Sequence, residues 1–327
     1  MRSKAVGIDI SKDKFDVALY DTETYQEAVF TNDKKGFRSL YNWLKKMKAR
    51  DAVICMEATG RHAEAAAMYL YERGVSVSIV NPARIKAYRE SQLKRNKTDR
   101  EDAKAIAHFA ITQDFSLWTP PPPEVQELQA LVRRLKTLKE ERTRETNRKK
   151  SIVTSKAVLK SIEKHIKFIN EQINQIEKQI EDLFDQHPDL KEQKELLESI
   201  PGIGPVTAAN FIAEVGDIKR FESAKQLAAY AGLTPRWYQS GTSVNKPGRL
   251  SKRGNIRLRT VFYMAAMAAI RSNPFVISLA TRMEKQGKSR MSIIGASMRK
   301  LVHLAYGVLK NQQPFDPHHL DNMLDIA

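Results

Sequence analysis

The chain has 327 residues, and its 55 Lys and Arg against 38 Asp and Glu give a formal net charge of +17. This length allows two domains and a connector, and the positive charge favours a nucleic acid partner, because phosphate contacts release counterions and dominate affinity. A membrane partner is disfavoured because no apolar run reaches the roughly 18 residues of a spanning helix. The single cysteine, Cys55, excludes an internal disulfide framework.

The first segment, residues 1–119, alternates between strand and helix patterns. Its start leads into a strand pattern rather than an apolar signal core, so we expect a cytoplasmic location. The patterns predict strands at 4–10, 14–20, 25–31, 52–57 and 75–80, and helices at 36–48, at 62–73 and onward to 112. Such alternation is typical of an α/β domain with one mixed sheet, whose site lies near strand ends.

Two of these strands carry an acidic residue. Asp9 stands inside the apolar run 6–10, where a purely structural strand disfavours a carboxylate. Glu57 closes the run 52–57, just before a break at 58–60. Glu57 alone also fits an ordinary surface residue, whereas Asp9, flanked by isoleucines, does not.

A helix start adds two more carboxylates. Thr98 and Glu101 have capping-box spacing, which predicts a helix that begins at Asp99 and carries Asp102 on the same face. Singly, each aspartate fits a helix-terminal acid favoured by the helix dipole. Gathered carboxylates repel unless cations neutralise them, and two Mg²⁺ ions roughly 3.5–4 Å apart serve this role in phosphodiester cleavage. The four residues interpreted as ligands of Mg²⁺, or of Mn²⁺ in its place, are Asp9, Glu57, Asp99 and Asp102.

Residues 120–190 follow a stiff proline run and have a different pattern. Leucines recur at steps of three and four between 128 and 138, and an unbroken heptad pattern runs from 162 to 183. The pattern predicts a coiled coil, either an arm between subunits or two helices of one chain folded back on each other. The connector also holds cations that either bind a nucleic acid backbone or lie on a solvated helix face. The arginines in question are Arg142, Arg144 and Arg148.

The last segment, residues 191–327, opens with a glycine-containing loop at 200–205 between two helix patterns. This arrangement is typical of a helix-hairpin-helix, in which Gly202 and Gly204 let the loop backbone approach a phosphate and free amides of the second helix face the anion. The alternative is a loop that joins two helices for structural reasons alone.

Residues 231–243 form a second glycine-containing loop pattern, rich in hydroxyl groups. A hydroxyl beside many cations can attack a phosphate while the cations stabilise the developing charge. A structural serine in a turn is the commoner case. Residue physics alone does not choose among Tyr238, Ser240, Thr242 and Ser243. The downstream cations that we assign to nucleic acid binding are Lys246, Arg249, Lys252 and Arg253.

Several short motifs follow one another in order along almost the whole chain. They are Gly7-Ile8-Asp9-Ile10-Ser11-Lys12, Glu57-Ala58-Thr59-Gly60, Asn81-Pro82, Asn96-Lys97-Thr98-Asp99 with Asp102, Ile200-Pro201-Gly202-Ile203-Gly204, Ala231-Gly232-Leu233-Thr234-Pro235 and Ser240-Gly241. Each motif is weak alone, but the ordered set resembles the DEDD-type transposases of bridge-RNA-guided insertion sequences.

The resemblance implies an RNase H-like (RuvC-type) catalytic domain at 1–119, a coiled-coil connector at 120–190 and a C-terminal transposase domain at 191–327. It implies that the four carboxylates hold the metal and that Ser240 is the nucleophile, which forms a transient phosphoserine bond to DNA. It also implies a structured non-coding RNA that pairs with the element ends and the target, so that the protein reads shape and backbone. The subunits would act as a homo-oligomer, a dimer or tetramer, in a bacterial or archaeal nucleoid.

The sequence therefore predicts a metal-assisted DNA recombinase that inserts and excises its own mobile element. One alternative is a junction-resolving endonuclease that uses the same carboxylates with a water nucleophile, so that Ser240 is only structural. Another is a DNA-binding architectural protein without enzymatic activity, in which the acids are helix caps and surface charges.

Overall fold

The computed structural model describes residues 4–22, 24–58, 61–92, 98–151, 155–240 and 244–318, and side chains for all of these except 61–62, 237–240 and 244–247. The chain divides within the proline run into two compact units, Met1–Pro120 and Pro121–Ala327. The further division at 190 that the sequence suggested stays a prediction. Within the described ranges no single helix is long and apolar enough to cross a membrane, although one pair of helices joined by an 88° bend reaches that length and composition together.

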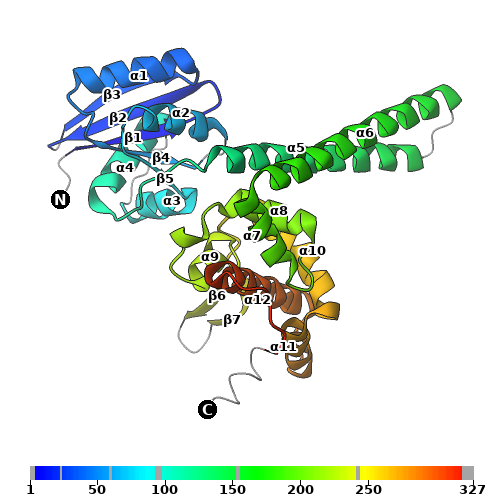
Figure 1. The fold of residues 1–327 in the computed structure, drawn as a ribbon. Helices are drawn as coiled ribbons and strands as arrows, with labels where there is room; N and C mark the ends of the chain where they lie inside the picture. Colours follow the sequence, from blue (N-terminus) through cyan, green and yellow to red (C-terminus); the bar gives the residue numbers. More distant parts are fainter. Residues whose placement is uncertain are drawn as a thin grey trace. The chain divides into compact units, whose positions relative to one another are not determined.

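The first unit is built on one five-stranded mixed sheet of order β3-β2-β1-β4-β5 (Figure 1). Its strands are β1 (Lys4–Ile10), β2 (Lys14–Asp21), β3 (Thr24–Thr31), β4 (Val53–Glu57) and β5 (Val77–Val80). β1, β2 and β3 pair antiparallel, whereas β4 runs parallel to β1 and β5 parallel to β4. The predicted mixed α/β sheet is confirmed.

Helices cover both faces of this sheet. They are α1 (Lys34–Lys46), α2 (Arg61–Tyr71), α3 (Pro82–Ser91) and α4 (Asp99–Thr112). Alternate residues of β1 point to opposite faces: Ile8 joins a core with the leucines of α1 and alanines of α2, and Ala5 joins a core with residues of α3 and α4. Burial of both faces explains why β1, β4 and β5 have nearly continuous apolar sequences, whereas the edge strand β3 is mostly exposed.

Gly7 of β1 permits the close approach of α4 to the sheet. A Cβ atom at this position would lie 2.1 Å from the carbonyl oxygen of Ala103 and 2.2 Å from the amide nitrogen of Ala107. Both atoms belong to the α4 backbone, which cannot move without leaving the sheet. Glycine is therefore required for the helix to pack here, and the packing brings the first turn of α4 toward the end of β1.

The second unit is mostly helical and has one large hydrophobic core. Its elements, apart from a two-stranded sheet, are α5 (Pro123–Lys150), α6 (Lys156–Gln186), α7 (Pro188–Glu198), α8 (Pro205–Val215), the 3₁₀ turn η1 (Ile218–Arg220), α9 (Ala224–Tyr230), α10 (Ile256–Ser272), α11 (Pro274–Lys285) and α12 (Arg290–Asn311). Leucines of α5 and isoleucines of α6 belong to the same core as the helices that follow. The heptad residues therefore contribute to folding of this unit.

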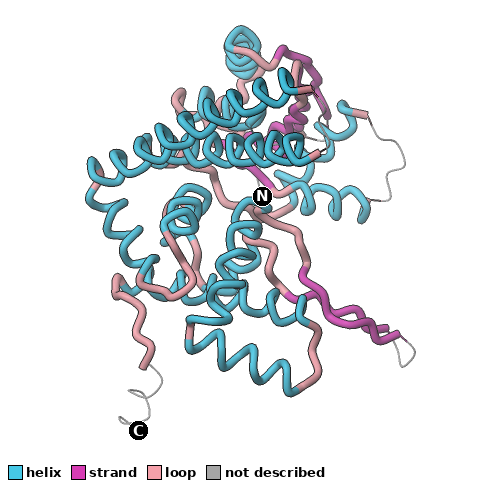
Figure 2. Tube along the Cα trace, turned by 90° about the vertical axis from the view of Figure 1, so that its right-hand side faces the viewer, coloured by secondary structure: helices cyan, strands magenta, loops and turns pink. Residues whose placement is uncertain are grey.

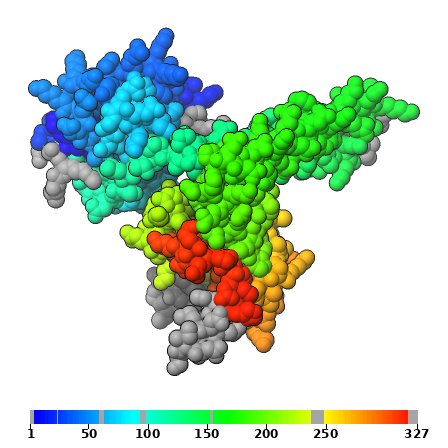
Figure 3. All heavy atoms as spheres, in the orientation of Figure 1, coloured from blue at the N-terminus to red at the C-terminus, as the bar shows by residue number. Residues whose placement is uncertain are grey.

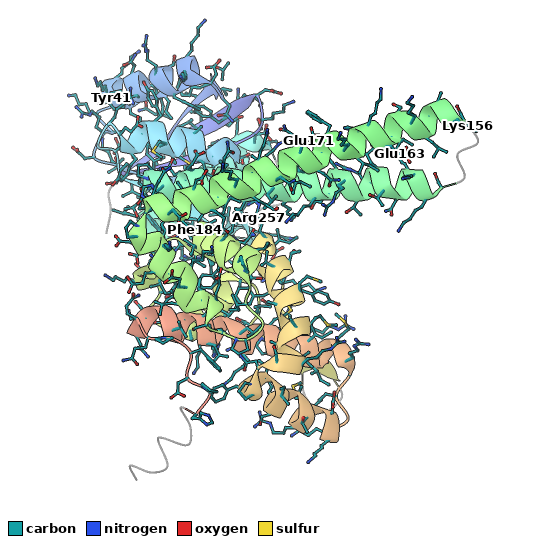
Figure 4. All side chains as sticks on the ribbon, turned by 45° about the vertical axis from the view of Figure 1, so that its right-hand side comes forward. Tyr41, Lys156, Glu163, Glu171, Phe184 and Arg257 are labelled. Atoms are coloured by element: carbon teal, nitrogen blue, oxygen red, sulfur yellow. The ribbon has the colours of Figure 1, made fainter. Side chains whose placement is uncertain are left out.

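The predicted coiled coil is a hairpin within one chain, formed by α5 and α6. Ion pairs join Lys139 to Glu177 at 2.7 Å and Lys149 to Glu163 at 2.8 Å, so residue numbers rise along one helix as they fall along the other. Figure 3 shows the two helices closely packed, and Figure 4 labels Glu163 and Phe184 near opposite ends of α6. This pairing supports the folded-back alternative and needs no second subunit.

The remaining strands, β6 (Pro235–Ser240) and β7 (Val244–Leu250), form an antiparallel hairpin. Figure 2 shows it extending away from the helices of this unit. The residue pattern predicts a loop over 231–243, and for 235–240 that prediction is wrong. Aromatic residues in this run favour a strand, and β7 supplies a pairing partner that residue patterns did not reveal. Residues 241–243 lie outside the described residues.

Candidate active site

Two of the predicted carboxylates lie at one end of the sheet in the first unit. The parallel register pairs Ile8 of β1 with Met56 of β4, so Asp9 and Glu57 each lie one residue further along the two neighbouring strands. Strand alternation places both side chains on the face that α4 covers, since Ala5 and Cys55 of the same strands belong to that core. The sheet therefore brings together two carboxylates that are 48 residues apart in the sequence, as 57 minus 9 gives.

The other two carboxylates come from the first turn of α4. The hydroxyl of Thr98 accepts a hydrogen bond from the Glu101 amide at 3.2 Å, which confirms the predicted helix cap. Asp99 and Asp102 then follow in the first turn, with side chains that are 58% and 17% exposed. Asp102 is the more enclosed because it lies closer to the sheet that Gly7 allows the helix to approach.

The electrostatics of Asp9 show that these carboxylates act on one another. Burial, the largest cause, and nearby negative charges together raise the pKa of Asp9 from 3.8 to about 6. In decreasing order of effect, the charges are those of Asp102, Glu57, Asp99 and Asp16. All four residues that the sequence assigned to the site therefore share one electrostatic environment.

Two cationic side chains neutralise part of this cluster. Lys14 Nζ lies 3.1 Å from Asp99 Oδ2 and 3.1 Å from Asp16 Oδ2, and Arg89 of α3 forms an ion pair with Asp102. The Arg89 guanidinium contacts the buried Oδ1 atom of Asp102. Across the described ranges, no three acidic, histidine or cysteine side chains converge closely enough to hold an ion in this arrangement.

Asp16 is a member of the cluster that the sequence analysis missed. It lies directly opposite Asp9 in the β1–β2 register and is only 4% exposed. Side chains opposite each other in an antiparallel pair lie on the same face, within about 5.5 Å between Cβ atoms. An aspartate between Phe15 and Val17 in a predicted strand carried the same signal as Asp9, an acidic residue inside an apolar run.

The serine candidate lies in the other unit. Ser240 is the last residue of β6 and pairs with Val244 of β7. The side chains of Tyr238, Ser240 and Lys246 lie outside the described residues, as do Thr242 and Ser243 altogether. The choice of nucleophile among these hydroxyl residues therefore stays a prediction.

The base of this hairpin is strongly basic. Arg236 and Arg249 are both exposed and lie directly opposite each other, an arrangement that is unfavourable for like charges on neighbouring strands. The exposed Lys252 and Arg253 follow in the turn before α10. A polyanion bound along this surface would relieve the repulsion.

The two glycines of the 200–205 loop have different surroundings. Gly202 has φ +101°, and a Cβ atom there would lie 2.6 Å from the Cβ of Ala269 in α10. Gly204 is the N-cap of α8, and a Cβ atom there would meet nothing within 4 Å. Packing against α10 thus accounts for Gly202, whereas Gly204 leaves the start of α8 open.

The connector arginines also differ. Arg142 donates a hydrogen bond to Asn170 of α6 at 3.2 Å, and Arg148 forms an ion pair with Glu145. Arg144 is exposed on the same helix. Arg148 is exposed as well, so Arg144 differs from it in lacking an ion pair with Glu145 rather than in its accessibility to a nucleic acid.

Comparison with known proteins decides the family. Residues 6–157 match a model of DEDD transposase domains described as "Transposase", and residues 194–279 match one described as "Transposase IS116/IS110/IS902 family". The chain is 34% identical to the pilin gene-inverting protein of Moraxella bovis over 319 residues, which cover 97% of the chain and 98% of that protein. The chain belongs to the IS110-type family of DEDD transposases.

Transposases of insertion sequences are among the relatives of this IS110-type protein. It is 26% identical to the transposase for insertion sequence element IS1111A of Coxiella burnetii, over 95% of the chain and 91% of that protein. It is 25% identical to the transposase for insertion sequence element IS1328 of Yersinia enterocolitica, over 80% of the chain and 82% of that protein. The predicted class of enzyme, a DNA transposase or recombinase, is thereby confirmed.

A DEDD transposase domain implies a divalent metal ion. The donors present fit such an ion in kind, because carboxylate oxygens are the ligands that Mg²⁺ and Mn²⁺ prefer. They also fit it in charge, because the raised pKa of Asp9 indicates negative charge in the cluster that lacks full compensation. The side chains of Lys14 and Arg89 would have to yield part of their contacts to the ion.

Proposed function

We propose that this transposase cleaves and rejoins DNA through two groups of residues, a metal-binding cluster in the first unit and a serine nucleophile in the second. The observation that carries the proposal is the shared electrostatic environment of the four carboxylates at one end of the sheet. The substrates would be the ends and target of the chain's own mobile element, which the protein would insert and excise.

The first unit would be an RNase H-like domain of RuvC type. Its sheet order, with three antiparallel strands leading into two parallel strands, supports this assignment. In such a sheet, residues at the carboxyl ends of parallel strands form the site, which is where Asp9 and Glu57 lie. The assignment of Gly202 and Gly204 to a helix-hairpin-helix belongs to the same proposal.

The residues proposed to hold Mg²⁺, or Mn²⁺ in its place, are Asp9, Glu57, Asp99 and Asp102. When bound, the metal would supply Lewis-acid polarisation of the scissile phosphate. The carboxylates themselves fix where the metal lies, and Asp9 must lose its proton to act as a ligand. Lys14 and Arg89 hold the cluster together when the metal is absent.

Ser240 would act as the nucleophile. Its hydroxyl would lose its proton and its oxygen would bond to phosphorus. The bond from phosphorus to the deoxyribose leaving oxygen would break, and that oxygen would take up a proton. The number of ester bonds to phosphorus is unchanged, so the reverse attack by another DNA end can reseal the strand without ATP. The basic residues around the hairpin would stabilise negative charge on the phosphate oxygens during the attack.

The remaining parts of the proposal concern partners and place. A structured non-coding RNA would select the DNA by base pairing, which agrees with the net charge of +17. The protein would act as a homo-oligomer, a dimer or tetramer, in the cytoplasm at the nucleoid. The proposed nucleic acid contacts are Arg142, Arg144, Arg148, Gly202, Gly204, Lys246, Arg249, Lys252 and Arg253.

A covalent adduct assay tests the nucleophile. The protein is incubated with its guide RNA and radiolabelled element-end DNA in Mg²⁺, denatured and separated by gel. We expect a labelled protein band from the wild type and from Tyr238→Phe, Thr242→Val and Ser243→Ala, and no band from Ser240→Ala. Phosphoamino acid analysis of the band should yield phosphoserine.

Other outcomes separate the competing functions. Metal-dependent cleavage without any adduct, and with full activity in Ser240→Ala, would support the endonuclease that uses water. An adduct that disappears in Ser243→Ala instead would move the nucleophile to that residue. Absence of cleavage in every metal and RNA condition, with tight DNA binding, would support the architectural protein.

A further inference from the structure

Glu214, near the end of α8, is a buried carboxylate in the second unit with an unusual set of partners. Its side chain is only 5% exposed. Glutamate is almost never this buried unless charged or hydrogen-bonding groups compensate for the loss of water. Nothing in the proposed chemistry of the metal cluster or of Ser240 uses this residue.

Three side chains from two other helices and a turn converge on Glu214. Arg133 of α5 donates from Nε to Oε1 at 3.3 Å, and Arg257 Nη1 lies 3.8 Å from the same oxygen (Arg257 is labelled in Figure 4). Asn255 Nδ2 donates to the other oxygen, Oε2, at 2.8 Å. Both carboxylate oxygens are therefore engaged, one by cations and one by an amide.

The backbone of Glu214 is engaged as well. The hydroxyl of Tyr230 donates to the Glu214 carbonyl oxygen at 3.0 Å, and the Tyr230 carbonyl accepts from the Asn255 amide at 2.7 Å. The side-chain oxygen of Asn255 also caps α10 by accepting from the Leu258 amide at 3.0 Å. Tyr230 and Asn255 are thus fixed to Glu214 and to each other.

Tyr230 and Asn255 lie at the outer ends of the two segments that flank the β6–β7 hairpin. We call these segments, residues 230–234 and 251–255, the feet of the hairpin. Tyr230 ends α9, shortly before β6 begins, and Asn255 follows shortly after β7 ends. Between them the two feet pair through backbone bonds: Lys252 N donates to Gly232 O at 3.1 Å, and Ser251 N donates to Thr234 O at 2.9 Å.

The feet also approach too closely to tolerate a side chain at one position. A Cβ atom at Gly254 would lie 2.3 Å from the Tyr230 carbonyl oxygen and 2.5 Å from the Gly232 amide nitrogen. The two segments are therefore packed backbone to backbone directly beside Asn255. A displacement at Tyr230 or Asn255 must pass into both strands of the hairpin.

We infer that Glu214 is a positioning residue, which fixes both feet of the hairpin and thereby sets where the far ends of β6 and β7 are held. The inference rests on the proposed function only in its last step, because Ser240 is the last residue of β6. The arrangement would hold the serine in one place while the strands themselves extend away from the helical core.

A buried carboxylate at residue 214 is better explained by a role in positioning its partners than by a contribution to the stability of the fold. An apolar side chain of similar volume stabilises a core as well as a buried ion pair does, or better. A carboxylate with fixed donors on each oxygen adds direction, because each donor must lie at one place to be satisfied. Loss of the charge leaves Arg133 and Asn255 competing for one remaining oxygen.

Hydrogen–deuterium exchange of the full-length protein, without DNA or metal, tests the positioning. Glu214→Gln should raise the exchange rate of amides in peptides covering 235–240 and 244–255 by about tenfold or more, as expected when fixed backbone bonds open locally. Peptides from the α5–α6 hairpin should keep their rates. Glu198→Gln is the matched control, since Glu198 is a partly buried glutamate of α7 in the same unit, and it should leave the hairpin unchanged.

A gentler variant guards against misfolding of Glu214→Gln. Tyr230→Phe removes only the hydroxyl that reaches the Glu214 carbonyl, and it should raise exchange in the same hairpin peptides by a smaller factor. Glu214→Asp, which keeps the charge, should fall between the wild type and Glu214→Gln. Unchanged hairpin exchange in both Glu214→Gln and Tyr230→Phe, or an equal rise throughout the second unit, would overturn the inference.

Strand-transfer kinetics provide the second readout. Glu214→Gln should lower the rate constant at saturating DNA by roughly 100-fold, as a misplacement of about 1 Å can do, with little change in the DNA concentration for half-maximal rate. A looser hairpin with an unchanged rate would also overturn the inference. The role of Ser240 is decided separately by the adduct assay, so either proposal can fail while the other stands.

Discussion

Lys14 Nζ lies 3.1 Å from Asp99 Oδ2, which places a lysine against one of the four carboxylates assigned to the metal. The same nitrogen lies 3.1 Å from Asp16 Oδ2, so one ammonium group joins a buried aspartate of β2 to an exposed aspartate of α4. Both contacts raise the pKa of Lys14, the hydrogen bond to Asp99 most. The lysine therefore stays charged and competes with any metal ion for Asp99.

This competition gives the first prediction, for Lys14→Met. Without metal the variant should unfold at a lower temperature than the wild type, because Asp16 loses its cationic partner. Added Mn²⁺ should raise its unfolding temperature by more than it raises that of the wild type, because metal no longer displaces a lysine. Differential scanning fluorimetry in EDTA and across a Mn²⁺ series measures both effects. Lys12→Met, at an exposed neighbouring position, is the control, and equal Mn²⁺ effects in all three proteins would show that Lys14 and the metal do not compete.

The second prediction concerns the four carboxylates themselves. Strand cleavage should fall by at least about 1,000-fold in each of four variants, because loss of one residue from a group that acts as a unit removes most of the activity of the whole group. The variants are Asp9→Asn, Glu57→Gln, Asp99→Asn and Asp102→Asn. Each should also preserve the fold, since removing one negative charge relieves repulsion in the cluster. Cleavage of labelled DNA with Mg²⁺ or with EDTA measures the effect, and the exposed Asp51→Asn should behave as wild type. Undiminished cleavage in excess EDTA, or by Asp102→Asn, would remove the metal assignment.

The third prediction follows from the raised pKa of Asp9. Its folded value of about 6 exceeds its ordinary value of 3.8, so between these values the folded metal-free protein binds more protons than the unfolded chain. Stability that is present below pH 3.8 is therefore lost as the pH rises through about 6. Urea unfolding of metal-free protein at several pH values should show Asp9→Asn gaining stability over wild type at pH 7, and gaining less at pH 4. An equal difference at both pH values would mean that Asp9 titrates normally.

Local patterns in the sequence were enough to predict the elements of the first unit and to select the four carboxylates that share one electrostatic environment. The capping box at Thr98 and the acidic residues inside apolar strands are signals carried by a few neighbouring residues. Lys14 and Arg89 were missed because their contacts arise from strand register and from packing of α3, which no local pattern contains. Asp16 carried the same local signal as Asp9, but only the strand register shows that the two residues lie opposite each other. The β6–β7 hairpin was also missed, because the residues of β6 form a strand only through pairing with β7, and a local pattern does not contain that pairing.

The two loop glycines give a fourth prediction. Gly202→Ala should lower the free energy of unfolding by about 1–3 kcal/mol, because its φ of +101° and its contact with Ala269 both exclude a Cβ atom. Gly204→Ala should change it by no more than about 1 kcal/mol, because the position is open and only the helix cap is altered. Urea denaturation measures both. If the folded fraction of Gly202→Ala binds DNA as tightly as wild type while Gly204→Ala binds more weakly, Gly204 is the residue of this loop that contacts phosphate.

The last prediction concerns the arginines of α5 and the proposed guide RNA. For a structured RNA, Arg144→Gln should reduce the magnitude of the slope of log binding constant against log salt concentration by about one. That change corresponds to the loss of one phosphate contact. Arg142→Gln and Arg148→Gln should reduce it less, because Asn170 and Glu145 already engage those side chains.

Filter binding of RNA at several salt concentrations measures the slopes, with Arg134→Gln, an exposed arginine of the same helix, as the control for a general loss of charge. Equal slopes in wild type and in the triple variant would assign these arginines to a solvated helix face. Recombination that persists after thorough RNase treatment would remove the RNA from the mechanism, whatever the slopes show.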